Sequence, residues 1–154
     1  MKIISGGQTG VDRAALDAAI GLGIEYGGSV AKGRIAEDGP IDRKYGNLVE
    51  LEAVNYSART EKNVEDADAT LIFTVGAPTE GTAFTLECAK KHGRDYLVID
   101  LKEKDDATVI TEIRKWLAGR LTQVLNVAGP RESKAPGIYE RVLNIFFDVF
   151  NPLT

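Results

Sequence analysis

Short apolar runs, each about the length of one β-strand, recur along the whole chain. The clearest run is Ala69–Val75, which is apolar on both faces except for Thr70 and Thr74, so we expect it to be buried on both sides. Together the runs predict strands at Met1–Ser5, within Tyr26–Ala31, and at Leu48–Glu52, Ala69–Val75, Tyr96–Leu101 and Val124–Ala128.

Longer segments with apolar residues at helical spacing separate most of these runs. They predict helices at Val11–Leu22, Tyr56–Asp66, Thr82–His92, Ala107–Leu117 and Ile138–Phe150. Strands that alternate with helices indicate an α/β domain, in which helices cover both faces of a mostly parallel sheet. The length of 154 residues fits a single domain, 1–154. The long polar segment Lys32–Asn47 is predicted to be a loop, and loops of this length are usually functional or disordered.

The first predicted strand runs into a glycine-rich turn, Gly6-Gly7-Gln8-Thr9-Gly10, and the turn opens onto the first helix. Glycine permits a close approach to the backbone, and the first N–H groups of a helix have no partner within it. A strand, a glycine turn and a helix N-terminus together form a common site for an anion, usually a phosphate. Gln8 and Thr9 add side-chain donors, although a tight turn that simply requires glycine would have the same sequence.

Three further loops follow predicted strands and therefore belong to the same edge of a parallel sheet. The segment 32–34 contributes Lys32 and Arg34, and the turn before the third helix contributes Gly81 and Thr82. The segment 129–134 combines a glycine and a proline with two cations and a hydroxyl. An acidic chain that gathers Lys and Arg beside two helix N-termini is suited to a small anionic ligand.

Composition and charge exclude several classes of function. The net charge of −4 and the pI near 5.1 argue against a general binder of nucleic acid or of anionic membranes. With one cysteine, Cys88, and one histidine, His92, the composition argues against a protein-built zinc or iron–sulfur site, so no metal ligands are predicted. The sequence has no apolar run long enough to span a bilayer and begins without a signal-peptide pattern, which predicts a cytoplasmic protein.

Several common nucleotide motifs do not fit. The first turn is not G-x-G-x-x-G, and Ala31-Lys32-Gly33-Arg34 stands where an acid should hold the ribose of a dinucleotide. No Lys-Ser/Thr pair follows the glycines, which excludes a P-loop. His92 precedes Gly93 at a predicted helix end, where capping is a better explanation than a Ser–His–Asp triad.

The motifs of the chain resemble the family named putative molybdenum cofactor carrier proteins, a Rossmann-like family of the SLOG superfamily. The resemblance extends from Ile3 to about Tyr139. Its residues are Gly6–Arg13, Lys32–Arg34, Ala36–Ile41, Arg59-Thr60, Asn63-Val64, Asp68–Phe73, Gly81-Thr82 and Leu125–Ser133.

This resemblance implies a Rossmann-like three-layer sandwich that binds a phosphate-bearing nucleotide-derived or pterin ligand, usually as a homo-oligomer. The cofactor would be molybdopterin or a nucleotide, and molybdenum cofactor would bring its metal on its own dithiolene. Molybdoenzymes or cofactor-synthesis proteins would be the partners. The candidate binding residues are Gly6, Gly7, Gln8, Thr9, Gly10, Arg13, Lys32, Arg34, Gly81, Thr82, Asn126, Gly129, Arg131 and Ser133.

The alternative is an enzyme, because the superfamily includes phosphoribohydrolases with the signature P-G-G-x-G-T-x-x-E. The matching segment here is Pro78–Thr85, in which Thr85 takes the place of the catalytic glutamate. Glu87 follows two residues later, on a different face of the helix. No catalytic residue is therefore assigned, and binding without chemistry is the favoured interpretation, although Asp12 or another carboxylate could supply a base.

The last predicted helix has a wide apolar face that includes Ile138, Val142, Ile145, Phe146, Val149 and Phe150, with Leu143 and Phe147 beside it. So wide a face predicts either an interface between subunits or a helix that lies deep in its own core.

Overall fold

The computed structural model describes residues 1–151, which form an α/β domain with a Rossmann-like arrangement of three layers. The six strands of the main sheet lie in the order β5-β2-β1-β8-β6-β7, and every neighbouring pair is parallel. The strands are β1 (Lys2–Ile4), β2 (Glu25–Val30), β5 (Leu48–Glu50), β6 (Ala69–Thr74), β7 (Asp95–Asp100) and β8 (Val124–Ala128).

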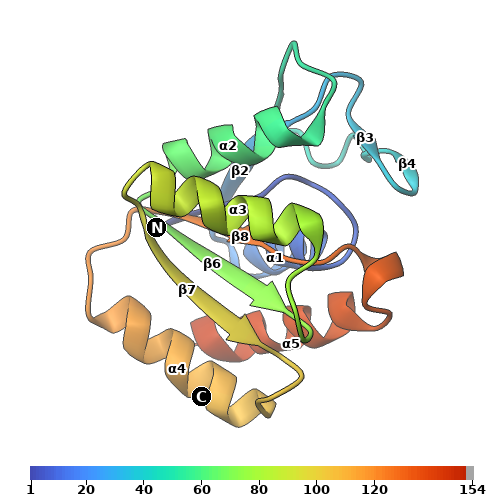
Figure 1. Cartoon of the computed structure of the whole chain (residues 1–154). Helices are drawn as coiled ribbons and strands as arrows, with labels where there is room; N and C mark the ends of the chain where they lie inside the picture. The colour runs from blue at the N-terminus through green and yellow to red at the C-terminus, as the bar shows by residue number, and fades with distance from the viewer. Residues whose placement is uncertain (152–154) are drawn as a thin grey trace.

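In residues 1–151, five α-helices cover the two faces of the sheet, as the alternating pattern predicts. Helices α2 and α3 pack against each other on one face, whereas α5 packs between α1 and α4 on the other (Figure 1). The helices are α1 (Val11–Leu22), α2 (Tyr56–Asp66), α3 (Glu80–Lys91), α4 (Asp106–Ala118) and α5 (Ile138–Phe150), and a short 3₁₀ helix, η1, spans Glu132–Lys134.

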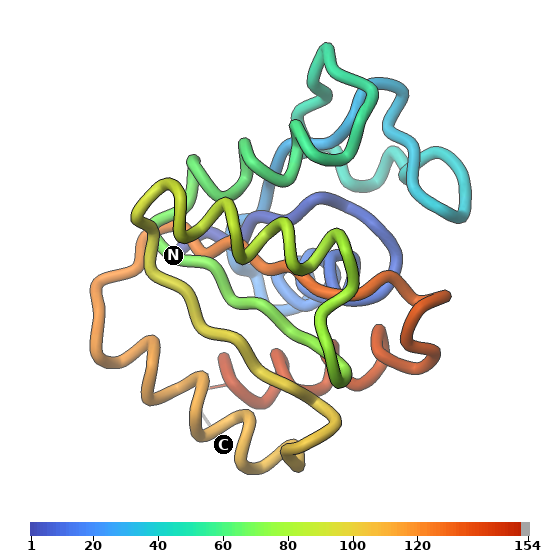
Figure 2. The backbone as a smooth tube through the Cα atoms, in the orientation of Figure 1, coloured from blue at the N-terminus to red at the C-terminus, as the bar shows by residue number. Residues whose placement is uncertain are grey.

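The segment predicted to be a loop between residues 32 and 47 contains a small antiparallel hairpin. Strands β3 (Ile35–Ala36) and β4 (Gly39–Pro40) form this hairpin, which stands away from the main sheet (Figure 2). Ile41 and Tyr45 follow it and are buried with Leu16, Val30 and Leu48 in a core cluster of their own. Two isolated apolar residues form no helical or strand pattern, so the sequence does not predict that this segment packs on a small core of its own.

Helix α5 lies in the core of its own chain. Ile138, Val142, Ile145, Phe146 and Val149 are all buried, and the Phe146 ring meets the Phe73 ring edge-on at 5.9 Å. Phe147, outside this stripe, packs against Gly21 of α1. Of the two explanations for its apolar face, burial within the chain is therefore the one that the structure supports. Among the described residues, no helix is long and apolar enough to cross a membrane.

The close pairing of β1 with β2 depends on Gly28. This residue has φ +133°, and an added Cβ would lie 2.0 Å from the Ser5 carbonyl oxygen. We predict that Gly28→Ala lowers the free energy of unfolding by at least about 2 kcal/mol, because the backbone must strain and the strands must separate. The exposed Gly46 is the control, since its Cβ would have no atom nearer than the Arg43 oxygen at 3.9 Å. Urea denaturation should show a change for Gly46→Ala within about 0.5 kcal/mol, and equal losses in both variants would contradict the prediction.

Candidate functional site

A cavity of about 490 Å³ opens at the carboxyl edge of the sheet. It lies where the loops after β1, β6 and β8 meet the N-terminal half of α2, so its wall combines segments that are far apart in the sequence. Its volume is in the range of small-molecule sites. The lining residues are Gln8, Asp12, Tyr56, Arg59, Thr60, Thr79, Glu80, Gly81, Thr82, Thr85, Ala128, Gly129, Arg131 and Lys134.

The N-terminus of α3 faces this cavity without a side-chain cap. Thr79 occupies the N-cap position, but its hydroxyl donates to the Thr82 hydroxyl at 3.0 Å and makes no hydrogen bond to the helix backbone. The first N–H groups of a helix have no partner within it, and its dipole places partial positive charge at this end. The cavity wall therefore includes backbone donors that suit an anion.

Three cationic side chains, Arg59, Arg131 and Lys134, line the same cavity. Arg131 has a side chain that is 40% exposed, and its Nε lies 3.8 Å from a carboxylate oxygen of Glu37. Within the part of the chain that the structure describes, the Lys134 ammonium has no ion-pair partner. The cations outnumber the lining carboxylates Asp12 and Glu80, so the cavity favours a negatively charged ligand.

Gly6 makes room for Arg59. An added Cβ at Gly6 would lie 2.1 Å from the Arg59 Nη1, so the guanidinium occupies the space that any larger residue would fill. The same Nη1 lies 3.6 Å from a carboxylate oxygen of Asp12. The glycine at the end of the first strand thus admits a cation from α2 as well as permitting a tight turn.

Asp12 places a carboxylate of the protein itself beside the glycine turn. It lies in the first turn of α1 and is 4% exposed, and one of its oxygens accepts the Gln8 N–H at 3.3 Å. Burial raises the pKa of this carboxyl, and Arg59 only partly offsets that effect. Because Asp12 takes up a donor of the first turn, the N-terminus of α3 is the better position for an external anion.

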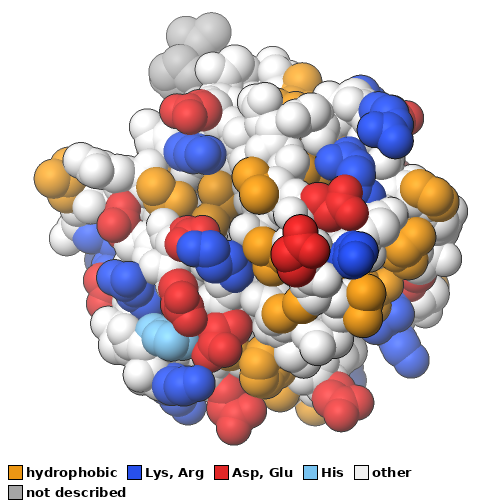
Figure 3. All heavy atoms as spheres, turned by 90° about the horizontal axis from the view of Figure 1, so that it is seen from above, with side chains coloured by type: hydrophobic (Ala, Val, Ile, Leu, Met, Phe, Trp, Pro, Cys, Tyr) orange, Lys and Arg blue, Asp and Glu red, His pale blue; other side chains and the backbone are white. Residues whose placement is uncertain are grey.

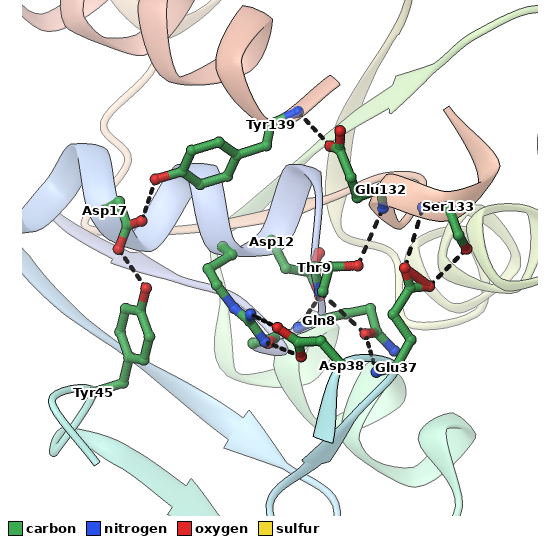
Figure 4. A network of polar contacts seen from close by, with 12 residues as sticks. Gln8, Thr9, Asp12, Asp17, Glu37, Asp38, Tyr45, Glu132, Ser133 and Tyr139 are labelled. Atoms are coloured by element: carbon green, nitrogen blue, oxygen red, sulfur yellow. Dashed lines mark hydrogen bonds and ion pairs between the residues drawn. The ribbon is translucent and has the colours of Figure 1, made fainter. Parts of the chain in front are cut away.

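The polar side chains of the first turn connect loops to one another. The Gln8 side-chain oxygen accepts the N–H groups of Thr9 and Glu37, at 3.1 and 2.8 Å, and the Thr9 hydroxyl accepts the Glu132 N–H at 3.1 Å. Figure 4 shows these contacts converging from the glycine turn, the β3–β4 hairpin and η1. Gln8 and Thr9 therefore connect the glycine turn to the β3–β4 hairpin and to η1.

A second cavity of about 700 Å³ lies on the other side of the glycine turn, and carboxylates dominate its wall. These carboxylates have partners in the protein: Asp38 accepts two bonds from the Arg13 guanidinium, which hold the pKa of Asp38 below its usual value. Asp17 accepts the hydroxyls of Tyr45 and Tyr139 (Figure 4). Burial and the nearby Asp17 raise the pKa of Tyr139 to about 12. This network closes the hairpin against α1, and its carboxylates outnumber the cations Arg13 and Lys44 in the wall.

The structure brings only some of the predicted binding residues to the first cavity, namely Gln8, Gly81, Thr82, Gly129 and Arg131. Gly6 and Asn126 line a small pocket that shares Asp12 and Arg59 with that cavity. Thr9, Gly10 and Arg13 line the second cavity instead.

The remaining four predicted residues line neither of the two cavities nor the small pocket. Arg34 donates to the carbonyls of Asp42 and Tyr45, Ser133 donates to Glu37, and the Lys32 side chain is exposed away from both walls. Gly7, with φ +74°, has no room for a Cβ beside Ile41.

The remaining lining residues are only weakly indicated by sequence patterns. Tyr56 and Thr60 belong to the first half of α2, which follows β5 and therefore begins at the same edge of the sheet. Neither residue is charged or lies in a glycine turn, so the pattern of an anion site does not single them out. Arg59 and Asn63 lie four residues apart on one helix face, a spacing that predicts either a reach to this edge of the sheet or a tie between the helix and the long loop. Arg59 lines the cavity, whereas the Asn63 amide bonds both backbone groups of Ser29. The clash between a Gly6 side chain and Arg59 becomes visible only when both elements are in place.

The fold and the cavity define a Rossmann-like domain with an anion-compatible site at the carboxyl ends of its parallel strands. The model of the "Circularly permutated YpsA SLOG family" matches residues 3–150, nearly the whole chain. The protein therefore belongs to this family.

A solved structure, that of the "Putative molybdenum carrier protein" from Syntrophus aciditrophicus SB, is also similar. It is 46% identical, has a TM-score of 0.94, and the match covers 97% of this chain and 94% of that one. No curated protein matches the sequence.

The buried carboxyl of Asp12 leads to a pH prediction. Its folded-state pKa is raised above the ordinary value of 3.8, so lowering the pH protonates the folded protein before the unfolded chain and removes the cost of burying a charge. We predict that the free energy of unfolding of the wild type, relative to Asp12→Asn, rises as the pH is lowered from about 7 to about 4. Urea titrations of both proteins at each pH measure this difference, and a constant or falling difference would show that the carboxyl is not destabilised by burial.

Proposed function

We propose that the first cavity binds a small phosphate-bearing ligand, nucleotide-derived or of the pterin type, and that the protein carries or stores it in the manner of a molybdenum cofactor carrier. The single observation that supports this most is the meeting of Arg59, Arg131 and Lys134 with the uncapped N-terminus of α3 around one cavity. The name of the Syntrophus aciditrophicus structure supports the choice of molybdenum cofactor as cargo.

In this proposal the phosphate lies at Gly81 and Thr82, where the N–H groups of α3 and the Arg131 guanidinium can bind it together. Gln8 and Gly129 also line this cavity and would contact the rest of the ligand. The lining residues include no cysteine or histidine. That composition suits a cargo that holds its own metal, as molybdopterin does through its dithiolene.

The wider setting is also a proposal. A carrier of this kind would work in the cytoplasm, receive its ligand from cofactor-synthesis proteins and deliver it to molybdoenzymes. A homo-oligomer is proposed from the family resemblance alone, because the apolar face of α5 that suggested an interface is buried within the chain.

Binding without chemistry is favoured over hydrolysis because of Thr85. Its side chain is buried, and its hydroxyl donates to the Gly81 carbonyl one turn earlier in α3, at 3.1 Å. A hydroxyl in that bond cannot replace the carboxylate of a phosphoribohydrolase as an acid or base.

We predict that the protein releases no free base from nucleoside monophosphates, as measured by chromatography after prolonged incubation. Release that disappears in Asp12→Asn would establish the enzyme instead.

Arg131 provides the direct test of binding. Glu132, its neighbour, accepts the N–H groups of Gly137 and Tyr139 at 2.6 and 3.0 Å, so it is engaged at the start of α5. Arg131 itself has one long contact with Glu37, at 3.8 Å. We predict that Arg131→Ala weakens binding about ten- to a hundredfold, the value of a lost charge-assisted hydrogen bond, with an unchanged melting temperature.

The measurement is calorimetry with isolated molybdenum cofactor and with GMP, after native mass spectrometry has identified any retained ligand. Arg94→Ala is the matched control, because Arg94 lies beyond the opposite end of α3 and contacts the Glu65 carbonyl. A lower melting temperature with unchanged affinity would mean that Arg131 is part of the scaffold.

A further inference from the structure

Three metal-ligating side chains meet on the surface between α2 and α3, away from both cavities. Glu61 and Glu65 lie one turn apart on α2, and His92 is the C-cap residue of α3. The His92 Nε2 lies 2.9 Å from an oxygen of Glu61 and 3.3 Å from an oxygen of Glu65. One ligand atom from each residue lies within 4.8 Å of the others. Figure 3 shows this histidine in a mixture of acidic and basic side chains.

These separations suit a common tetrahedral ion. Zinc binds imidazole nitrogen and carboxylate oxygen at roughly 2.0–2.2 Å, so the ligand atoms of a tetrahedral site are about 3.3 Å apart. The two nitrogen–oxygen distances in the cluster are close to that value. The side chains of Glu61, Glu65 and His92 are 32%, 43% and 25% exposed, so an ion from solution can reach them.

Within the cluster, the carboxylate oxygens outnumber the N–H donors that His92 can offer them. A neutral imidazole nitrogen presents at most one N–H, yet two carboxylate oxygens approach the same Nε2. Lys91 offsets part of the negative charge, because its ammonium lies 3.0 Å from the Glu61 oxygen that also faces His92. Among the described residues, Glu65 forms no close ion pair with a lysine, although Lys62 and Lys91 are near enough to interact with it electrostatically. A divalent cation would bind both carboxylates and the nitrogen lone pair at once.

We propose that Glu61, Glu65 and His92 form a divalent transition-metal site, occupied by zinc with water as the fourth ligand. The imidazole ligand favours zinc, copper or nickel over magnesium and calcium, which prefer oxygen alone. Composition argued against a protein-built metal site because the chain has one histidine and one cysteine. That count of histidine and cysteine leaves out carboxylates, and Glu61 and Glu65, one helical turn apart, supply two such ligands.

The position of the site gives it a structural role. It joins the C-terminal end of α3 to α2, and the N-terminal parts of both helices line the first cavity. A bound ion would fasten the two helices on the face of the sheet that carries Arg59 and the uncapped helix end. The site is separate from the ligand cavity, and its existence does not depend on what that cavity binds.

The test uses untagged, chelator-treated full-length protein and zinc ions as the probe. Competition with a fluorescent zinc chelator measures the affinity of the wild type, His92→Gln and Glu65→Gln. We expect one zinc ion per chain in the wild type and at least about a tenfold loss of affinity in each variant, because each removes one of three ligands. Glu87→Gln is the control, since Glu87 is an exposed carboxylate on the same helix outside the cluster.

Lys91→Ala separates a metal site from an ion-pair cluster. Removing a competing cation should leave zinc binding intact or strengthen it, and zinc should raise the melting temperature of the wild type but not of His92→Gln. Absence of zinc binding by the wild type at micromolar concentration would overturn the proposal. So would equal affinity in the wild type and His92→Gln, which would place the ion elsewhere.

Discussion

The close contact between the glycine turn after β1 and the loop after β8 determines where the other loops can lie. The Val11 N–H donates to the Pro130 carbonyl at 3.2 Å, and a Cβ at Gly10 would lie 2.5 Å from that same oxygen. Such an approach is possible only for a residue without a side chain and with φ +78°. The contact fixes the start of α1 beside residues 130–132. It therefore places the Arg131 loop at the same cavity as Gln8 and Asp12.

The two cavities on either side of the glycine turn differ in how their charges are satisfied. In the second, Asp17 accepts two tyrosine hydroxyls and Asp38 accepts the Arg13 guanidinium, so these carboxylates are satisfied within the protein, although the buried Arg13 Nε has no hydrogen-bond partner among the described residues. In the first, Lys134 and the end of α3 face the cavity without comparable partners among the described residues. This asymmetry distinguishes a surface whose carboxylates hold the fold together from the one that we propose as the anion site.

Strand and helix periodicity predicted the layers, and the parallel-sheet rule predicted which loops share an edge. Side-chain partners could not be predicted in the same way. Arg34 and Arg131 both follow strands in glycine-containing loops, yet Arg34 donates to the carbonyls of the 41–45 segment whereas Arg131 faces the cavity. That difference depends on how the β3–β4 hairpin folds back. It follows from long-range packing, which no local sequence pattern contains, and the same holds for Arg59 beside Gly6.

The central position of β8 has a consequence for the order of assembly. Strand β8 pairs with β1 on one side and β6 on the other, so it alone connects the β5-β2-β1 half of the sheet to the β6-β7 half. A ribosome releases residues 124–128 after every other strand, and until then β1 and β6 each present an unpaired edge. The nascent chain must keep two half-sheets from pairing with other molecules before its last strand closes the gap. Pairing across more than 120 residues also makes this final step slow relative to local helix formation.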